Sequence, residues 1–429
     1  MSAMRTWTLA LTVIGFGAME LAVVACGSDN DTSTLTGEDA AKSEATSDDA
    51  PTSDSSNSDA SSLDASDASD TATATDGSLL GDGGIPSGHQ LAVGNSHSCR
   101  IKAGAIKCWG KNDKGQLGNG TMSPAASFVD VIGITNAVEI AGGGDRTCAR
   151  LSTGHVKCWG DGDGGRLGNN ATASSGTPVD VSNLVDAIAI TAGDYNTCVL
   201  RSNGHTACWG SNGIGDGSST RSVPTEPTPA FTDAVGIGAG WGHTCVLRSN
   251  GSAKCWGTYN VWGQVGDGTK QDRTTPVDVL GITNGSTVAL GTYHSCARLS
   301  NATVACWGNN QGGQLGLGTK DEGDHSATAV PGLTDVASIY GNGFGTCAIT
   351  TNGTPYCWGS SPGTGFGAST SPQEVTALGK TTEIAGGSGH TCALKANGEI
   401  ACWGYSSSNE LGYDAGGAQV LMPVVVSGI

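Results

Sequence analysis

The stretch HTCALKANGEIACWG, from His390 to Gly404, is the unit from which most of this 429-residue chain is built. It holds two cysteines around a short alternation of apolar and polar residues, with an Asn-Gly dipeptide in the middle. Six near-copies precede it, at residues 97–110, 146–160, 196–210, 243–257, 294–308 and 345–359. Their first cysteines follow one another at intervals of 45–51 residues. A period near 50 residues with strand-like patterning predicts a radial array of sheets.

Composition agrees with an all-β fold. The chain contains 69 glycines spread along its length, which indicates many turns and many short strands. Seven repeats fill residues 85–429, so we predict a seven-bladed β-propeller of four-stranded antiparallel blades. The last repeat ends at Ile429, where an apolar strand would be expected next. We therefore expect residues 89–93 to pair into the last blade and close the ring.

The two cysteines of each unit are expected to form a disulfide. In five units a glycine stands six residues after the first cysteine, where a three-residue hairpin loop favours positive φ. This loop places the two cysteines directly opposite each other, close to disulfide geometry. Zinc binding is the competing interpretation, but the spacing lacks the usual short knuckle between ligands. The predicted pairs are Cys99–Cys108, Cys148–Cys158, Cys198–Cys208, Cys245–Cys255, Cys296–Cys306, Cys347–Cys357 and Cys392–Cys402.

The N-terminal part predicts export. Residues 1–25 have the pattern of a signal peptide, and Ala25-Cys26 resembles the lipobox of bacterial lipoproteins. Lipidation would also explain why Cys26 stands outside the seven pairs. The alternative is an ordinary secretory signal followed by an incidental cysteine. We expect a lipid anchor in the outer membrane of a Gram-negative bacterium, on its periplasmic or its outer side.

Residues 26–84 are rich in Ser, Thr, Asp and Ala, and a segment with so few apolar side chains cannot offset its ordering entropy. We predict a disordered tether, with a functional acidic tail as the alternative. Residues 27–82 alone contain 14 acidic side chains and a single lysine, within a net charge of −18 for the whole chain. This balance opposes binding to nucleic acid. We expect a monomer that touches the membrane only through the lipid on Cys26.

The repeat resembles a known family. The signals His-x-Cys, Asn-Gly, Cys-Trp-Gly and GQLGNG (residues 115–120) are similar to those of the regulator of chromosome condensation repeat. That resemblance implies a seven-bladed propeller. Its eukaryotic namesake exchanges nucleotide on a small GTPase and binds chromatin, so a nucleotide-exchange regulator is one alternative function. Export, acidity and the lack of a basic patch argue against it here.

The best candidate site lies where residues depart from the repeat, in the loops before the first cysteine and after Cys-Trp-Gly. Both loops should emerge on one face, opposite the hairpin turns. Aromatic side chains on adjacent blades would form an arc suited to a protein or glycan partner, with charged residues as a rim. The alternative is that these rings fill gaps between blades. The candidates are Tyr195, Trp241, Tyr259, Trp262, Tyr293, Phe344 and Tyr405, with Asp145, Arg146 and Asp194 as the rim.

A second repeated feature is a histidine two positions before the first cysteine, present as His97, His243, His294 and His390. Packing or hydrogen bonding is the favoured role, and a metal site is the alternative. We expect no metal and no cofactor. Because no carboxylate pair, nucleophile elbow or phosphate loop stands out, a binding module is favoured over an enzyme. A polysaccharide lyase or hydrolase and a purely structural envelope protein remain as alternatives.

Overall fold

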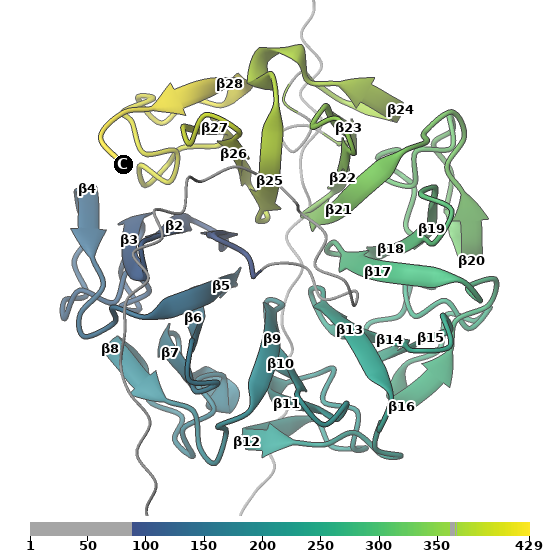
Figure 1. Cartoon of the computed structure of the whole chain (residues 1–429), viewed down its shortest axis with the longest axis horizontal. Helices are drawn as coiled ribbons and strands as arrows, with labels where there is room; N and C mark the ends of the chain where they lie inside the picture. Colours follow the sequence, from purple (N-terminus) through teal and green to yellow (C-terminus); the bar gives the residue numbers. More distant parts are fainter. Residues whose placement is uncertain (1–87, 361–364, 366) are drawn as a thin grey trace, which may run out of the picture. The chain divides into compact units, whose positions relative to one another are not determined.

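The computed structural model describes residues 88–360, 365 and 367–429 of the chain. These residues form seven four-stranded antiparallel sheets, arranged as blades around a central axis (Figure 1). The predicted seven-bladed propeller is therefore confirmed. The predicted signal peptide, Cys26 and the tether lie outside the described residues. Within the described part of the chain, no helix is long and apolar enough to cross a membrane.

Each blade takes its four strands from consecutive stretches of chain, with the innermost strand first. Blade 1 comprises β1 (Leu91–Val93), β2 (His97–Lys102), β3 (Ala105–Gly110) and β4 (Ala125–Asp130). Blade 2 comprises β5 (Ala137–Gly143), β6 (Arg146–Leu151), β7 (Val156–Gly160) and β8 (Ser175–Asp180). Blade 3 comprises β9 (Ala187–Ala192), β10 (Asn196–Arg201), β11 (Thr206–Ser211) and β12 (Thr220–Thr225). Blade 4 comprises β13 (Ala234–Ala239), β14 (His243–Arg248), β15 (Ala253–Gly257) and β16 (Arg273–Asp278). Blade 5 comprises β17 (Gly285–Leu290), β18 (His294–Leu299), β19 (Val304–Gly308) and β20 (Asp324–Ala329). Blade 6 comprises β21 (Val336–Asn342), β22 (Gly345–Thr350), β23 (Pro355–Gly359) and β24 (Ser369–Glu374). Blade 7 comprises β25 (Thr381–Gly386), β26 (His390–Lys395), β27 (Ile400–Gly404) and β28 (Val420–Val426). Two short 3-10 turns, η1 (Asp163–Gly165) and η2 (Thr376–Leu378), lie in loops.

The central hairpin of each blade has the predicted register. Cys392 lies directly opposite Cys402, and all seven pairs form disulfides with Cα–Cα distances of 4.0–4.1 Å. The turn glycines have positive φ, such as 80° at Gly154. Blade 5 has Ala302 at this position, and it adopts the same left-handed conformation with a φ of 62°. The register therefore survives the replacement, although a residue with a Cβ adopts this conformation less readily than glycine does.

The ring closes differently from our expectation. β1 pairs with β2 in the first blade, with Leu91 opposite Arg100, so residues 89–93 do not pair into the last blade. The last blade is complete without them, because its repeat supplies β25 as the inner strand and β28 as the outer strand. Closure comes instead from packing and from side-chain hydrogen bonds between the first and last blades. A buried cluster joins Leu91, Val93 and Trp109 of blade 1 to the last blade, where it includes Leu411 and Val426.

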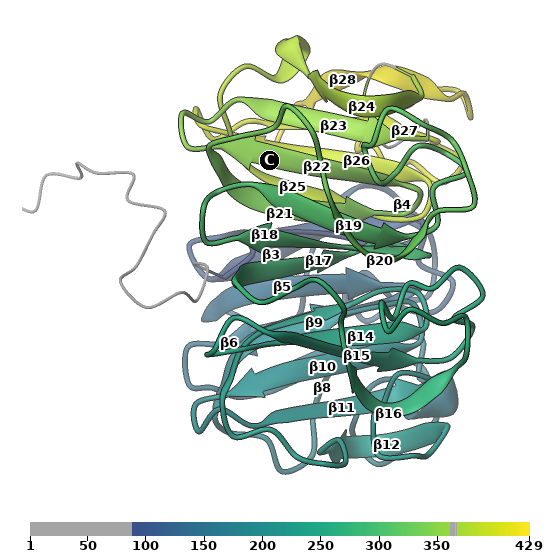
Figure 2. The same cartoon turned by 90° about the vertical axis from the view of Figure 1, so that its right-hand side faces the viewer.

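The strands run between two faces of the ring, as the edge-on view shows (Figure 2). We call the side with the hairpin turns the turn face and the other side the loop face. The register of β1 against β2 places the chain before Gln90 at the turn-face end of blade 1, where the Gln90 carbonyl accepts a bond from the Ile101 N–H at 2.8 Å. Gln90 therefore lies on the face opposite the candidate site.

Candidate functional site

The loop face is built from two loops per blade, which are held together by a backbone hydrogen bond. The residue after Cys-Trp-Gly donates its N–H to a carbonyl in the loop before the first cysteine. In blade 3, Ser211 donates to Tyr195 at 2.9 Å, and in blade 5 Asn309 donates to Tyr293 at 2.9 Å. The prediction that both loops emerge on one face is thus confirmed.

Five aromatic rings on this face form a continuous series, which we call the aromatic arc: Tyr195, Trp241, Tyr259, Tyr293 and Phe344. The Trp241 ring is central, with its centroid 5.1 Å from Tyr195, 5.0 Å from Tyr259 and 5.4 Å from Tyr293. Phe344 extends the series, 6.2 Å from Tyr293. The rings come from blades 3, 4, 5 and 6, so side chains about 150 positions apart in sequence meet on one surface.

The arc is open to solvent at its edges. Tyr259 is 51% exposed and Phe344 is 45% exposed, whereas Trp241 is partly buried between its neighbours. Burial raises the pKa of Tyr293, and the neighbouring Tyr195 and Asp194 add to this rise. The phenol therefore stays neutral and can act as a hydrogen-bond donor.

One cation belongs to the arc. The Arg166 guanidinium lies 4.9 Å from the centroid of the Tyr195 ring, and it also forms an ion pair with Asp161. Arg166 was not among the predicted site residues. Its signal was available, because Arg166 occupies the position that glutamine has in the GQLG motif of blades 1 and 5 and in the related GQVG of blade 4.

A small pocket adjoins the arc between blades 4, 5 and 6. Its volume is about 290 Å³. Three of its lining side chains, Trp262, Tyr293 and Phe344, were predicted as site residues. The others were not predicted: Asn309, Gln311, Gly312, Gln314 and Ser360.

The structure does not support every predicted site residue. Tyr405 is 51% exposed, but within the described part of the chain no aromatic ring packs against it, so the arc ends at blade 6. Asp145 lies with Lys111, whose Nζ is 3.6 Å from its Oδ2. Asp194 is half-buried, and burial raises its pKa while the charge of Arg146 opposes this rise.

The placement of Arg146 in the rim is wrong, because its side chain is fully buried between blades 2 and 3. Its guanidinium donates to Thr197 Oγ1 at 3.0 Å and to the carbonyls of Gly193 and Asp194, each at 2.8 Å. Two further carbonyls, of Gly143 and Asn196, also accept from it. Arg146 therefore has a structural role.

Arg146 belongs to a series of equivalent contacts at the seven blade interfaces. In each, a nitrogen of one blade meets the hydroxyl that precedes the first cysteine of the next blade. The contacts are His97–Thr147 (2.8 Å), Arg146–Thr197 (3.0 Å), Asn196–Thr244 (2.7 Å), His243–Ser295 (2.9 Å), His294–Thr346 (2.8 Å), Asn342–Thr391 (3.2 Å) and His390–Ser98 (2.7 Å). The predicted hydrogen-bonding role of the histidines is confirmed.

The histidines in these contacts are neutral. Thr147 Oγ1 donates its own proton to the Gln116 carbonyl at 2.9 Å, so it must accept from His97 Nε2. Burial lowers the pKa of His97 to about 3 and that of His294 to about 4. Within the described residues, no group of three His, Cys, Asp or Glu side chains is arranged to hold a metal ion.

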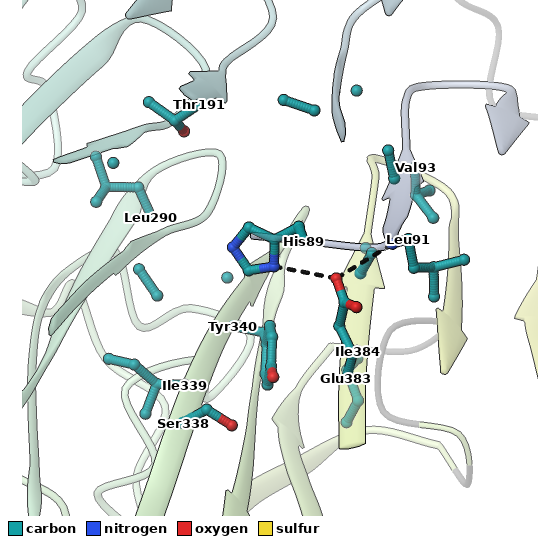
Figure 3. A pocket seen from close by; sticks show the side chains of 18 of the residues that line it. His89, Leu91, Val93, Thr191, Leu290, Ser338, Ile339, Tyr340, Glu383 and Ile384 are labelled. Carbon is teal, nitrogen blue, oxygen red and sulfur yellow. Dashed lines mark hydrogen bonds and ion pairs between the residues drawn. The ribbon is translucent and has the colours of Figure 1, made fainter. Parts of the chain in front are cut away.

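The inner strands enclose a central channel of about 960 Å³. Small and aliphatic side chains line most of it, and His89 points toward Glu383 at its turn-face end (Figure 3). The His89 Nδ1 lies 3.0 Å from Glu383 Oε1, and the ring lies edge-on to Tyr340 with centroids 6.3 Å apart. The channel is the larger cavity, but it arises from closing seven blades into a ring. The distinctive side chains are on the loop face.

These features define a class of protein: a seven-bladed propeller with a disulfide across every blade and an aromatic surface on one face. Comparison with known families is more specific. The regulator of chromosome condensation (RCC1) repeat matches residues 153–200, and a second profile of that repeat matches residues 137–166, 234–264, 286–314 and 382–410. The chain therefore contains repeats of the RCC1 type, and its structure arranges them as a seven-bladed propeller. No curated protein matches its sequence.

Solved structures agree on the fold. Yeast RCC1 (Prp20) bound to Kap60 has a TM-score of 0.67 at 21% identity, covering 76% of this chain and 84% of that one. Prp20p from Saccharomyces cerevisiae, described with its binding to Gsp1p and histones, has a TM-score of 0.68 at 20% identity, with 77% and 87% covered. Human WBSCR16 has a TM-score of 0.62 at 19% identity, with 76% and 94% covered. At these identities the likeness shows the fold alone.

Proposed function

We propose that this protein is an exported, lipid-anchored binding module that holds a macromolecular partner on its aromatic arc. The observation that carries the proposal is the continuous ring series on four consecutive blades, with Tyr259 and Phe344 about half exposed. Rigid aromatic side chains lose little conformational entropy on binding and dominate the energetics of interfaces. Relatives of this fold bind proteins, as yeast RCC1 binds Kap60.

The arrangement of the chain supports this function. The rings are held by a frame of disulfide-closed hairpins, so the surface is preorganised. Gln90, at the start of the first inner strand, lies at the turn-face end of blade 1, opposite the loop face that carries the arc. The acidic chain remains unsuited to nucleic acid, and we expect it to act as a monomer.

The test is crosslinking of the intact cell envelope with the full chain. Trp241→Ala and Tyr259→Ala should each abolish capture of the partner that the wild type retains. The control is Val185→Ala, which truncates a 59% exposed apolar side chain on the turn face. Capture that survives both arc substitutions would refute the site. Palmitate labelling that persists in Cys26→Ser would refute the anchor, independently of the arc.

A further inference from the structure

The pocket beside the aromatic arc has a chemical character of its own. Three rings line it, from Trp262 of blade 4, Tyr293 of blade 5 and Phe344 of blade 6. Its remaining side chains are amides and a hydroxyl, and its lining contains no charged group. Its volume of about 290 Å³ is at the lower end of the ~300–1,000 Å³ typical of small-ligand pockets. It suits a single small ring and not an extended ligand.

The polar floor of the pocket is preorganised. Gln314 is buried, and its Nε2 donates to Asn309 Oδ1 at 2.6 Å. Its Oε1 accepts from the Gly312 N–H at 2.8 Å, while Asn309 Oδ1 also accepts from the Gln311 N–H at 2.9 Å. These bonds hold the backbone of residues 309–314 in place, so Gln311 lies at a fixed place on the pocket edge with its side chain exposed.

This combination identifies a ligand that is uncharged, presents apolar faces to rings and carries hydroxyls at its edges. A neutral glycosyl unit has these properties, because its axial C–H groups form flat apolar faces and its equatorial hydroxyls pair with amides. An anionic sugar or a phosphate would find no cation in the lining. A charged peptide side chain would lack a partner for the same reason.

The geometry of the aromatic arc suits a ligand longer than one glycosyl unit. Successive rings from Tyr195 through Trp241 and Tyr293 to Phe344 are 5.1, 5.4 and 6.2 Å apart. Their planes are inclined by 79°, 59° and 49°, so the rings contact one another edge-on or tilted and form one continuous apolar surface. A glycan seated in the pocket can therefore continue along this surface.

We infer that the partner of the aromatic arc is a neutral glycan, with one glycosyl unit in the pocket of Trp262, Tyr293, Phe344 and Gln311. This inference rests on the proposed function and names the chemical class of its partner. The arc supplies apolar contacts along the glycan, and the pocket supplies the hydrogen bonds that select a neutral unit.

The test is calorimetric titration of the full chain with linear neutral hexasaccharides of glucose and of N-acetylglucosamine, and with hexagalacturonate as the anionic probe. One neutral probe should bind with an affinity that salt hardly changes, because no ion pair is involved. Gln311→Ala and Phe344→Ala should each weaken binding about tenfold. Both side chains are exposed, so both variants should fold. Val185→Ala on the turn face should bind as the wild type does.

Two outcomes would overturn the inference. Failure of both neutral probes to bind, while Trp241→Ala still abolishes capture in the envelope, would overturn the assignment of a neutral glycan and leave the proposed function standing. Preference for the anionic probe, lost at high salt, would show that charge and not the neutral pocket selects the ligand. Shortening of a bound hexasaccharide during the titration would instead reveal an enzyme and overturn the binding-module proposal itself.

Discussion

The His390 Nε2 lies 2.7 Å from Ser98 Oγ, although 292 positions separate the two residues. This contact joins the last blade to the first in the same way that His243 and Ser295 join blades 4 and 5. The Ser98 hydroxyl also donates to the Glu410 carbonyl at 3.0 Å. The closing interface is therefore equivalent to the six internal ones, although no strand crosses it.

Ser98→Ala should destabilise the propeller by about 1–3 kcal/mol, because it leaves the buried Nε2–H of His390 without an acceptor. Ser98→Thr is the matched control, since threonine occupies the equivalent position in five blades. It should cost well under 1 kcal/mol. Urea denaturation of the two variants measures the difference, and equal losses would show that the hydroxyl contact does not matter.

The repeat residues predicted the fold because each acts within one repeat or between neighbours. The cysteine spacing determines the hairpin register, and the register alone brings Cys392 opposite Cys402. Closure was mispredicted because residues 89–93 had been aligned correctly with the inner strand of a blade but assigned to the wrong one. The strand pairs locally, as inner strands do in the other six blades.

Less of the candidate site than of the fold could be predicted from the sequence. Aromatic residues in equivalent loops could be placed on one face, but the pocket depends on loops of three blades packed together. Arg146 was misplaced for a different reason. Its position looked like a loop position, whereas the equivalent histidines show that it points into the blade interface. The available signal was that Arg146 occupies the position that holds histidine in four of the other six blades.

The four interface histidines should make stability depend on pH. Burial lowers the pKa of His243 from 6.5 to about 3, so the unfolded chain binds a proton there that the folded chain does not. The contribution of these histidines to the free energy of unfolding is complete above pH 6.5 and is lost as the pH falls below that value. Each histidine should add about 1.4 kcal/mol per pH unit to the slope of the unfolding free energy.

His243→Asn provides the test, because Asn196 makes the equivalent contact to Thr244 in blade 3. Its unfolding free energy should vary with pH less steeply than that of the wild type, by about 1.4 kcal/mol per pH unit between about pH 5 and 6. Urea titrations at several pH values measure this slope. An unchanged slope would mean that His243 is not held neutral in the folded state.

His89 should respond to pH in the opposite sense. Partial burial at the channel wall lowers its pKa, but the hydrogen bond and charge of Glu383, with the charge of Glu139, outweigh this and raise it to about 9. Glu139 itself is paired with Arg150, whose Nε lies 2.7 Å from its Oε2. The stabilisation from His89 is thus complete below pH 6.5 and is lost as pH rises toward 9.

Glu383→Gln should lower the pKa of His89, which an NMR titration of its ring protons measures directly. About half of the His89 side chain is exposed, so solvent screens the pair and the effect on overall stability should be small. Glu399→Gln, which removes an exposed carboxylate from a hairpin turn, is the control. A His89 pKa that is the same in the wild type and Glu383→Gln would exclude the ion pair.

The disulfides should be inaccessible in the folded protein. All fourteen hairpin cysteines have 0% relative exposure. Millimolar dithiothreitol should therefore leave them unreduced under native conditions and reduce them only after unfolding. Alkylation followed by mass spectrometry counts the modified hairpin cysteines in each state. Modification of any hairpin pair before unfolding would show that its blade opens locally.

Blades 5 and 6 contain a natural exchange of residues. In blade 5, Gly291 makes room for His294, and a Cβ added to this glycine would lie 2.1 Å from the histidine Cε1. In blade 6 the equivalent positions are Asn342 and Gly345, so the large residue and the glycine have changed places. The Asn342 amide then takes over the contact to the next blade, donating to Thr391 at 3.2 Å.

This exchange of residues predicts that combining two destabilising substitutions in blade 5 restores part of the lost stability. Gly291→Asn alone should destabilise the propeller by about 1–3 kcal/mol through overpacking against His294, whose ring is anchored to Thr346. His294→Gly alone should also destabilise it, because the Thr346 hydroxyl loses its donor and a cavity opens. The double variant reproduces blade 6 and should be more stable than the sum of the single effects predicts, by about 0.5–3 kcal/mol. Urea denaturation of all four proteins completes the cycle. Strictly additive losses would show that the two positions are independent and that the blade 6 arrangement is not transferable.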